Sequence, residues 1–311
     1  MGESFQKFNL LVILGPTASG KTRVGVEIAA ALDGQIISAD SRQVFRGMDL
    51  GTGKDLKEYA GVPYHLIDIV DPGYEFSVFE FQRRFSEAFI DIQSRGMLPI
   101  LVGGTGLYLD AILLKYRMFE VPRNDRLRKE LEPPNLEMLA ARLKKANLRL
   151  HNTTDLLDRE RVIRAIEISE FKEEDTEQFS LPDLKPIVFG IGWSREALRQ
   201  RITLRLRERM NQGMIEEVKR LHKSGVSFQT LDFYGLEYRF IGEYLKGELN
   251  RNDMFQKLNS AIHRFAKRQE TWFRRMERQG TPIHWVDGSK EPAKAILQVL
   301  GSHRVNDSSS C

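Results

Sequence analysis

Hydrophobic and polar positions alternate along the first hundred residues in a pattern typical of parallel βαβ units. Short apolar runs predict buried strands, and each is followed by a longer segment with helical spacing. We expect strands at 9–14, 35–39, 64–70 and 99–102, and a fifth far along the chain at 186–191. Helices are expected over 23–32, ending at Asp33-Gly34, and over 78–94. The pattern therefore predicts an α/β fold with a parallel sheet flanked by helices.

The stretch between the fourth and fifth strands lacks a good strand pattern and predicts a helical insertion. Apolar spacing favours one helix from Leu136 to Asn147 and another around 162–168. After the fifth strand we expect two long amphipathic helices, one from the N-cap Ser194 to Gly225 and one ending at Gly280. We expect this division: core 1–115, insertion 116–184, core completion with basic helices 185–300, and a disordered polar tail 301–311.

A phosphate-binding loop joins the first strand to the first helix. The segment GPTASGKT, residues 15–22, fits the pattern G-x-x-x-x-G-K-[ST] in the strand–loop–helix context that the pattern requires. Its glycines let several backbone N–H groups point into one hollow, and the helix N-terminus adds partial positive charge. Lys21 brings a cation to the phosphates, and Thr22 offers a hydroxyl to Mg²⁺. The loop therefore predicts a diphosphate or triphosphate site that also takes Mg²⁺.

This loop alone does not name a reaction, since kinases, ATPases and switch proteins share it. An Asn-Lys-x-Asp guanine signature is missing, and the fourth strand ends in GGTGLY, residues 103–108, instead of the usual Asp. The second strand delivers Asp40 to the carboxyl edge of the sheet, where ligands of such folds bind. Asp40 has two possible functional roles, as a general base or as an outer-sphere Mg²⁺ ligand. It is otherwise an ordinary turn residue.

Composition and charge exclude several classes of protein. The 311 residues carry 47 Lys and Arg against 43 Asp and Glu, a net charge of +4, with a single Cys. One Cys forms neither an internal disulfide nor a zinc knuckle, which fits the reducing cytoplasm. The longest apolar run near the start, Leu10–Leu14, is too short for a membrane span. We expect a cytoplasmic, unanchored protein without membrane contact, and a monomer, since no heptad seam is visible.

Several motifs together resemble the bacterial tRNA dimethylallyltransferases, also called tRNA isopentenyltransferases. The resemblance rests on GPTASGKT, IISADSRQVFRGMDLGTGK, HLIDIVDPGYEFSVFEF, LPILVGGTGLYL, RVIRAIE and AKRQETWFRR, and it covers nearly the whole chain. It implies transfer of a dimethylallyl group from dimethylallyl diphosphate to N6 of the adenine 3′ of the tRNA anticodon. Mg²⁺ is the implied cofactor, and diphosphate is released. The fold implied is a core like that of the P-loop NTPases, with a helical insertion.

The resemblance also assigns roles to residues of this chain. Asp40 would accept the proton from N6, Thr105 would position the base, and Lys21 would act on the leaving diphosphate, with Mg²⁺ at Thr22. The implied diphosphate-binding residues are Gly15, Pro16, Thr17, Ala18, Ser19, Gly20, Lys21, Thr22, Arg201 and Arg205. The implied tRNA-binding residues are Asp40, Ser41, Arg42, Gln43, Thr105, Arg128, Glu160, Arg161, Val162, Ile163, Arg164 and Arg239.

The chain departs from the family pattern at three segments. It reads GMDLGTGKD where family members usually read GMDIGTAKP, and Glu237-Tyr238-Arg239-Phe240 replaces a common Gly-Tyr-Arg-Gln. Glu160 also takes the place of a Gln before Arg161 and Val162. These departures concern the RNA contacts more than the diphosphate site.

Basic charge is concentrated in the C-terminal helices. Residues 193–278 hold 19 Lys and Arg against 11 Asp and Glu, a local +8, and the remainder carries −4. Arg201 and Arg205 share a helix face, and the aromatic residues Phe265, Trp272 and Phe273 fall at core positions. This asymmetry favours RNA as the partner. Two alternatives remain: a P-loop small-molecule kinase or adenylate prenyltransferase, and an ATP-gated RNA-binding protein without group transfer.

Overall fold

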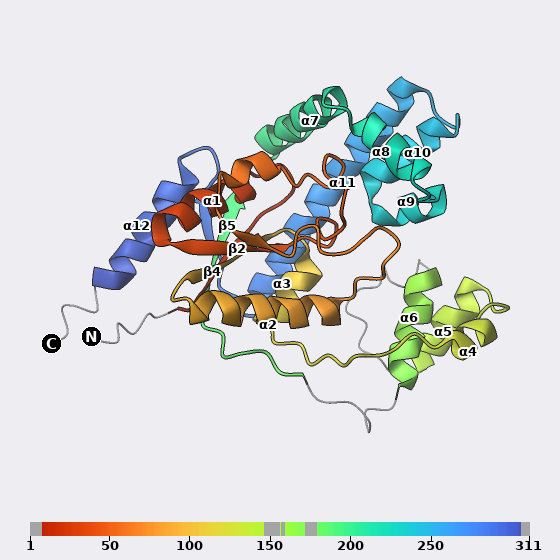
Figure 1. Cartoon of the computed structure of the whole chain (residues 1–311), viewed down its shortest axis with the longest axis horizontal. Coiled ribbons are helices and arrows are strands. Elements are labelled where there is room, and N and C mark those ends of the chain that lie inside the picture. Colours follow the sequence, from red (N-terminus) through yellow and green to blue (C-terminus); the bar gives the residue numbers. More distant parts are fainter. Residues whose placement is uncertain (1–7, 146–155, 157–158, 172–178, 306–311) are drawn as a thin grey trace. The chain divides into compact units, whose positions relative to one another are not determined.

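The computed structural model describes residues 8–145, 156, 159–171 and 179–305 (Figure 1). Its strands are β1 (Leu10–Leu14), β2 (Gly34–Ala39), β3 (Tyr64–His65), β4 (Leu98–Gly103), β5 (Pro186–Gly192) and β6 (His284–Asp287). Its helices are α1 (Lys21–Leu32), η1 (Leu56–Tyr59), α2 (Val78–Ser94), α3 (Gly106–Leu113), α4 (Asp125–Glu130), α5 (Leu136–Lys145), α6 (Arg159–Glu170), α7 (Arg195–Asn211), α8 (Met214–Lys223), α9 (Phe228–Tyr234), α10 (Leu236–Leu245), α11 (Arg251–Arg278) and α12 (Pro292–Val305).

The six strands form one parallel sheet in the order β3-β2-β4-β1-β5-β6, which confirms the expected α/β class. Alternate side chains of β1 enter opposite layers. Leu10, Val12 and Leu14 pack with α2, α3 and α11, whereas Leu11 and Ile13 pack with α1 and α12. Both faces are therefore covered, which explains why this strand reads as a continuous apolar run.

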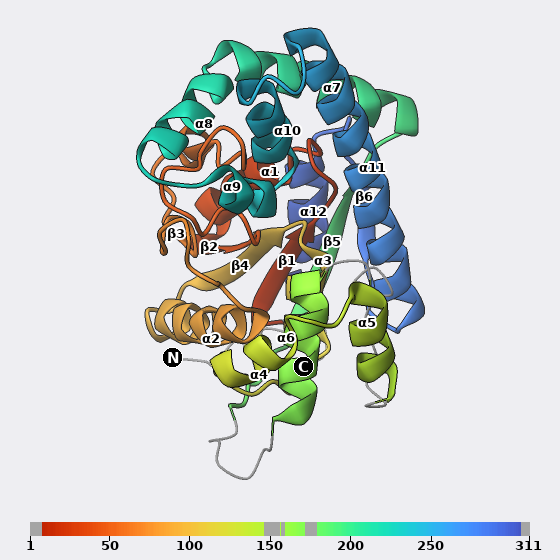
Figure 2. The same cartoon turned by 90° about the vertical axis from the view of Figure 1, so that its right-hand side faces the viewer.

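A third apolar cluster joins the loop after β2 to helices α7–α11. Val44, Phe45 and Met48 pack there against residues such as Leu206 and Leu258. Figure 2 shows these helices gathered as a cap over one end of the sheet. The cap brings the C-terminal helices to the edge where β1, β2 and β4 end.

The chain divides into two compact units, residues 1–116 with 181–311, and residues 117–180. The second unit has its own small core, in which Leu139 and Leu143 of α5 pack against Val162 and Ile166 of α6. Both expected helices of the insertion therefore form, and the short α4 is added to them. The expected end of the first helix, at 146–147, lies outside the described residues.

Three expectations about elements are corrected. The third strand stops at His65, because Leu66 and Asp68 take left-handed backbone angles (φ +65° and +56°) and turn the chain towards the loop after β2. The helix expected from Ser194 to Gly225 is two helices, α7 and α8, since Gly213 at φ +101° ends the first. The tail was expected from 301, but the backbone of α12 stays helical to Val305. The rest of that tail, 306–311, lies outside the described residues.

Candidate functional site

The phosphate-binding loop after β1 curls as the sequence requires. Ala18 and Gly20 both have left-handed angles (φ +62° and +85°), and the Ser19 amide donates to the Pro16 carbonyl. A Cβ on Gly15 would lie 2.6 Å from Ser19 Oγ, so this close turn needs glycine. Helix α1 begins at once with Lys21, which places its positive N-terminus at the hollow.

Three side chains from the C-terminal half fix the backbone of this loop. Gln269 Oε1 accepts from the Thr17 amide at 2.8 Å, and Gln269 Nε2 donates to the Gly104 carbonyl at 2.8 Å. Trp193 Nε1 donates to the Ser19 carbonyl, and Arg201 Nε donates to the Ala18 carbonyl. The loop is therefore held in shape before any ligand binds, which lowers the entropic cost of binding an anion.

Lys21 experiences an environment that disfavours its charge. Burial, together with repulsion from Arg205 and Arg209, lowers the pKa of Lys21 from 10.5 to about 8, although Asp40 acts in the opposite direction. An anionic group bound at the loop would relieve this repulsion. The electrostatics thus favour a phosphate ligand beside Lys21.

The ends of β2 and β4 bring Asp40 and Thr105 together. The Thr105 amide donates to the Ala39 carbonyl, and Thr105 Oγ1 accepts from the Ser41 amide at 3.2 Å. A Cβ on Gly103 would overlap that same Ala39 carbonyl, so glycine permits the close approach. Asp40 Oδ1 accepts from the Arg42 amide at 2.9 Å, which fixes the carboxylate orientation. The guanidinium of Arg42 lies 5.0 Å from the centre of the Phe233 ring.

Gln43 takes a structural place in the segment 40–43. Its side chain is buried, with Oε1 accepting from Ser38 Oγ and Nε2 donating to the Gly53 carbonyl. The side-chain amide therefore joins β2 to the loop 49–54. Direct contact of Gln43 with RNA, as the resemblance implied, is not available to a side chain buried in this way.

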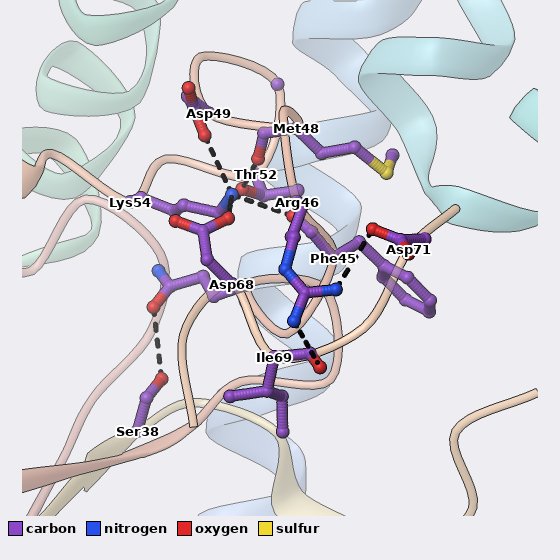
Figure 3. A network of polar contacts seen from close by, with 12 residues as sticks. Ser38, Phe45, Arg46, Met48, Asp49, Thr52, Lys54, Asp68, Ile69 and Asp71 are labelled. Carbon is purple, nitrogen blue, oxygen red and sulfur yellow. Dashed lines mark hydrogen bonds and ion pairs between the residues drawn. The ribbon is translucent and has the colours of Figure 1, made fainter. Parts of the chain in front are cut away.

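The loop 49–54 is held by a buried lysine (Figure 3). Lys54 is fully buried, and its Nζ donates to the Phe45 carbonyl and to Asp49 Oδ1 at 2.7 Å and to Asp68 Oδ1. Arg46 is tied to Asp71 and to the Ile69 carbonyl beside it. The left-handed turn after β3 therefore delivers Asp68 to the lysine.

The same loop is fixed from α8 by Glu217. This buried carboxylate accepts from the backbone amides of Asp49, Leu50 and Gly51 and from the Tyr238 hydroxyl. A Cβ on Gly51 would lie 2.5 Å from the Tyr238 ring, so the loop packs tightly on that side chain. The sequence shows only that Lys54 and Glu217 are charged. It does not predict that they are buried, because their burial comes from packing against residues far away in the sequence.

A small pocket opens beside the phosphate loop. Its wall includes Thr17 and Ala18 of the loop, Arg205 and Arg209 of α7, and Glu237 of α10. Arg201 lies next to the loop, stacked 4.1 Å from the Trp193 ring centre. The structure therefore places Arg201 and Arg205 beside the loop, and it adds Arg209, Asp55 and Gln269, which the sequence did not single out.

The implied tRNA residues of the second unit fall into three groups. Val162 and Ile163 are buried in that unit's core, so they support α6 and offer no surface to RNA, which corrects their assignment. Glu160 and Arg161 are exposed. Arg128 and Arg164 donate to the buried carboxylate of Glu167. Burial alone would raise the pKa of Glu167, but hydrogen bonds from Arg128, the Asn124 amide and Arg164 lower it to about 2.

Two further expectations concern the cap helices. Arg239 is exposed on α10 and pairs with Glu243 at 3.0 Å. Phe273 is buried as expected and Trp272 donates to Asp110, but Phe265 is 39% exposed, with Arg268 over its ring. The expected core position of Phe265 is therefore wrong, because the buried stripe of α11 passes through Ile262 and Ala266 on either side.

The donor groups at the loop suit Mg²⁺ bound with a phosphate ligand. Thr22 offers a hydroxyl, Asp40 offers a carboxylate, and no group of three or more His, Cys, Asp or Glu side chains with metal-binding geometry occurs among the residues described. Mg²⁺ commonly takes one or two protein oxygens, with phosphate oxygens and waters completing its octahedron. In the described part of the chain, no helix is long and apolar enough to cross a membrane.

Comparison with known proteins gives a consistent result. Residues 43–276 match the family model described as IPP transferase. The tRNA dimethylallyltransferase 1 of Geotalea uraniireducens is 65% identical over 292 residues, covering 94% of this chain and 97% of that protein. The tRNA dimethylallyltransferase 1 of Geotalea daltonii is 62% identical, covering 98% and 99%.

Solved structures resemble the fold over nearly its whole length. The tRNA isopentenylpyrophosphate transferase of Bacillus halodurans superposes with a TM-score of 0.70 at 33% identity, covering 97% of this chain and 98% of that one. A eukaryotic dimethylallyltransferase acting on tRNA gives a TM-score of 0.77 at 21% identity, covering 96% and 79%, and this likeness concerns the fold alone.

Proposed function

The chain belongs to the IPP transferase family, and on this premise we propose that it is a tRNA dimethylallyltransferase. It transfers the dimethylallyl group of dimethylallyl diphosphate to N6 of the adenine immediately 3′ of the tRNA anticodon, in the cytoplasm. The main observation behind this proposal is that the segments following three strands lie close together. The phosphate loop after β1, Asp40 after β2 and Thr105 after β4 lie at one edge of the sheet.

The residues at this edge divide the reaction between them. Asp40 accepts a proton from the adenine N6 as the nitrogen attacks the allylic carbon, and the carbon–oxygen bond to diphosphate breaks. The loop amides, Lys21 and Arg205 stabilise the charge that develops on the leaving diphosphate. Thr105 supports the segment after Asp40 through the Ser41 amide. The adenine must leave the base stack, since a stacked base does not present its amine in line with the breaking bond.

Thr22 is the residue that would hold Mg²⁺, which would supply charge neutralisation to the diphosphate. Replacing Thr22 with Ala removes one protein ligand. We expect the Mg²⁺ concentration that supports half-maximal diphosphate binding to rise in this variant. An unchanged requirement would remove Thr22 from this role.

One experiment tests the proposed function against its rivals. The protein is incubated with labelled dimethylallyl diphosphate, Mg²⁺ and either unmodified tRNA or free adenosine nucleotides, with and without ATP. Label in the RNA or nucleotide and ATP turnover are measured. We expect incorporation that depends on RNA and not on ATP. Incorporation into free adenosine nucleotides instead would indicate an adenylate prenyltransferase, and ATP turnover without incorporation would favour the kinase or the ATP-gated RNA-binding protein.

A further inference from the structure

Asp55 lies between two arginines that are one turn apart on α7. Its Oδ2 is 2.5 Å from Arg205 Nη2 and 3.1 Å from Arg209 Nη2. Burial would raise the pKa of Asp55, but the two guanidinium groups outweigh it and hold the pKa below its usual value. One carboxylate therefore links two cations beside the phosphate loop.

The two arginines differ in their surroundings. Arg209 is only 8% exposed, its Nε has no hydrogen-bond partner in the described part of the chain, and it packs under the loop at Gly53. A Cβ on Gly53 would overlap the Arg209 guanidinium. A buried guanidinium is costly unless it is paired, so the contact of Arg209 with Asp55 fixes both groups.

Arg205 is the partner that faces the site. Its side chain is 29% exposed and lines the pocket with Thr17 and Ala18 of the phosphate loop. Besides Asp55, it has a second contact at 3.5 Å with the Gly53 carbonyl, which is itself held by Gln43. The long side chain of Arg205 is therefore restrained on two sides, whereas a free arginine would lose rotamer entropy on binding a ligand.

The pocket keeps an excess of positive charge. Asp55 carries one negative charge against the two positive charges of Arg205 and Arg209. Lys21 is repelled electrostatically by both arginines. Glu237 lines the same pocket, and burial raises the pKa of its carboxyl. An anion that enters this pocket meets a guanidinium that is already in place.

We propose that Asp55 and Arg209 are positioning residues that hold the Arg205 guanidinium beside the phosphate loop, ready for the diphosphate. The proposal rests on the proposed function, because it takes a diphosphate as the ligand. Asp55 and Arg209 act through Arg205 and need not touch the reacting atoms.

Asp55→Asn separates positioning from simple charge balance. If Asp55 only neutralises charge, its loss makes the pocket more positive, and inorganic diphosphate binds more tightly. If Asp55 positions Arg205, the guanidinium is released and diphosphate binds about tenfold more weakly. Calorimetric titration of the full chain with inorganic diphosphate and Mg²⁺ measures the sign directly. Tighter or unchanged binding would overturn the proposal.

A double-mutant cycle tests whether the effect passes through Arg205. We expect Arg209→Met to weaken diphosphate binding in the native background and to have no further effect beside Arg205→Met. A loss of the same size in both backgrounds contradicts the proposal, since it shows that Arg209 acts alone through its charge. This cycle also decides the matter if Asp55→Asn fails to fold. Arg207→Met, on the exposed face of the same helix, is the matched control.

Steady-state kinetics distinguish a positioning role of Asp55 and Arg209 from a purely structural role. In variants with an unchanged thermal midpoint, we expect KM for dimethylallyl diphosphate to rise while KM for tRNA stays constant. Arg209→Lys, which keeps the charge, should restore part of the loss. If the native chain binds inorganic diphosphate but transfers no dimethylallyl group, the proposed function fails, and the titrations still decide the positioning role.

Discussion

The side-chain oxygen of Gln269 accepts a 2.8 Å hydrogen bond from the backbone amide of Thr17, a residue 252 positions earlier in the chain. The amide nitrogen of the same side chain donates to the Gly104 carbonyl. One buried glutamine of α11 therefore joins the loop after β1 to the loop after β4. Both loops belong to the proposed diphosphate site, so their relative position depends on this side chain.

Gln269→Glu keeps the shape of that side chain and removes its donor. The new carboxylate would face the Gly104 carbonyl, and it would place negative charge beside the diphosphate. We expect the free energy of unfolding to fall by about 2–4 kcal/mol and diphosphate affinity to fall as well. Urea unfolding and calorimetry measure the two effects. Gln256→Glu, exposed on the same helix, is the control, and an equal loss there would contradict the explanation.

Lys21 should make the stability of the protein depend on pH. Its pKa is about 8 in the folded chain, whereas an unfolded chain gives the lysine its ordinary pKa of 10.5. Between these values the unfolded chain binds more protons, so the free energy of unfolding gains a term that increases with pH. Lys21→Met should remove this increase. Urea unfolding of both proteins across this pH window measures the difference, and a constant difference would contradict the prediction.

Glu217 should be among the most sensitive positions for stability. Its buried carboxylate accepts from three backbone amides and from Tyr238. Glu217→Gln replaces one accepting oxygen with an NH₂ group, which would face N–H and O–H donors and find no acceptor. We expect a loss of about 3 kcal/mol in the free energy of unfolding. The exposed neighbour Glu216 serves as the control for the same substitution. A change below about 0.5 kcal/mol would show that the loop 49–51 rearranges freely.

The sequence predicts the parts of the fold that depend on local pattern. The helix over 78–94 and the N-cap Ser194 match the structure residue for residue, because apolar spacing and a capping hydroxyl are local signals. The strand β6 was missed, since His284–Asp287 is short and mostly exposed at the sheet edge. It is specified by its pairing with β5, as in Gly190 opposite Trp285.

The candidate site shows the same division. The phosphate loop could be predicted from the sequence because its glycines and Lys21 lie in one short segment. The sequence does not predict the roles of Gln269, Trp193 and Asp55. Each of them contacts the loop or α7 only after the C-terminal helices fold over the sheet. Val162 and Ile163 show the opposite error, because a motif within a helix contains core residues as well as surface ones.

Glu167 should make the second unit sensitive to acid. Its pKa is about 2 in the folded chain, below the ordinary 4.5, so its stabilising contribution is complete above about pH 4.5 and is lost as the pH falls towards about 2. Glu167→Gln should lose this contribution at neutral pH. Hydrogen exchange of the α6 amides, compared with native protein and with the variant Glu137→Gln at an exposed position of α5, measures it. Equal protection in all three would contradict the assignment.

Asp40→Asn tests the base role with little change of shape. The Asn oxygen can still accept from the Arg42 amide, so the turn after β2 should persist, but the side chain no longer accepts a proton from N6. We expect the rate of transfer to fall by about 10²–10⁴-fold, the usual contribution of a positioned base, while tRNA affinity changes by less than about twofold. Single-turnover transfer and filter binding of tRNA measure the two quantities. Asp71→Asn, at a 78% exposed side chain, is the control. Unchanged single-turnover transfer in Asp40→Asn would remove Asp40 from the base role and leave it as the residue that fixes the turn.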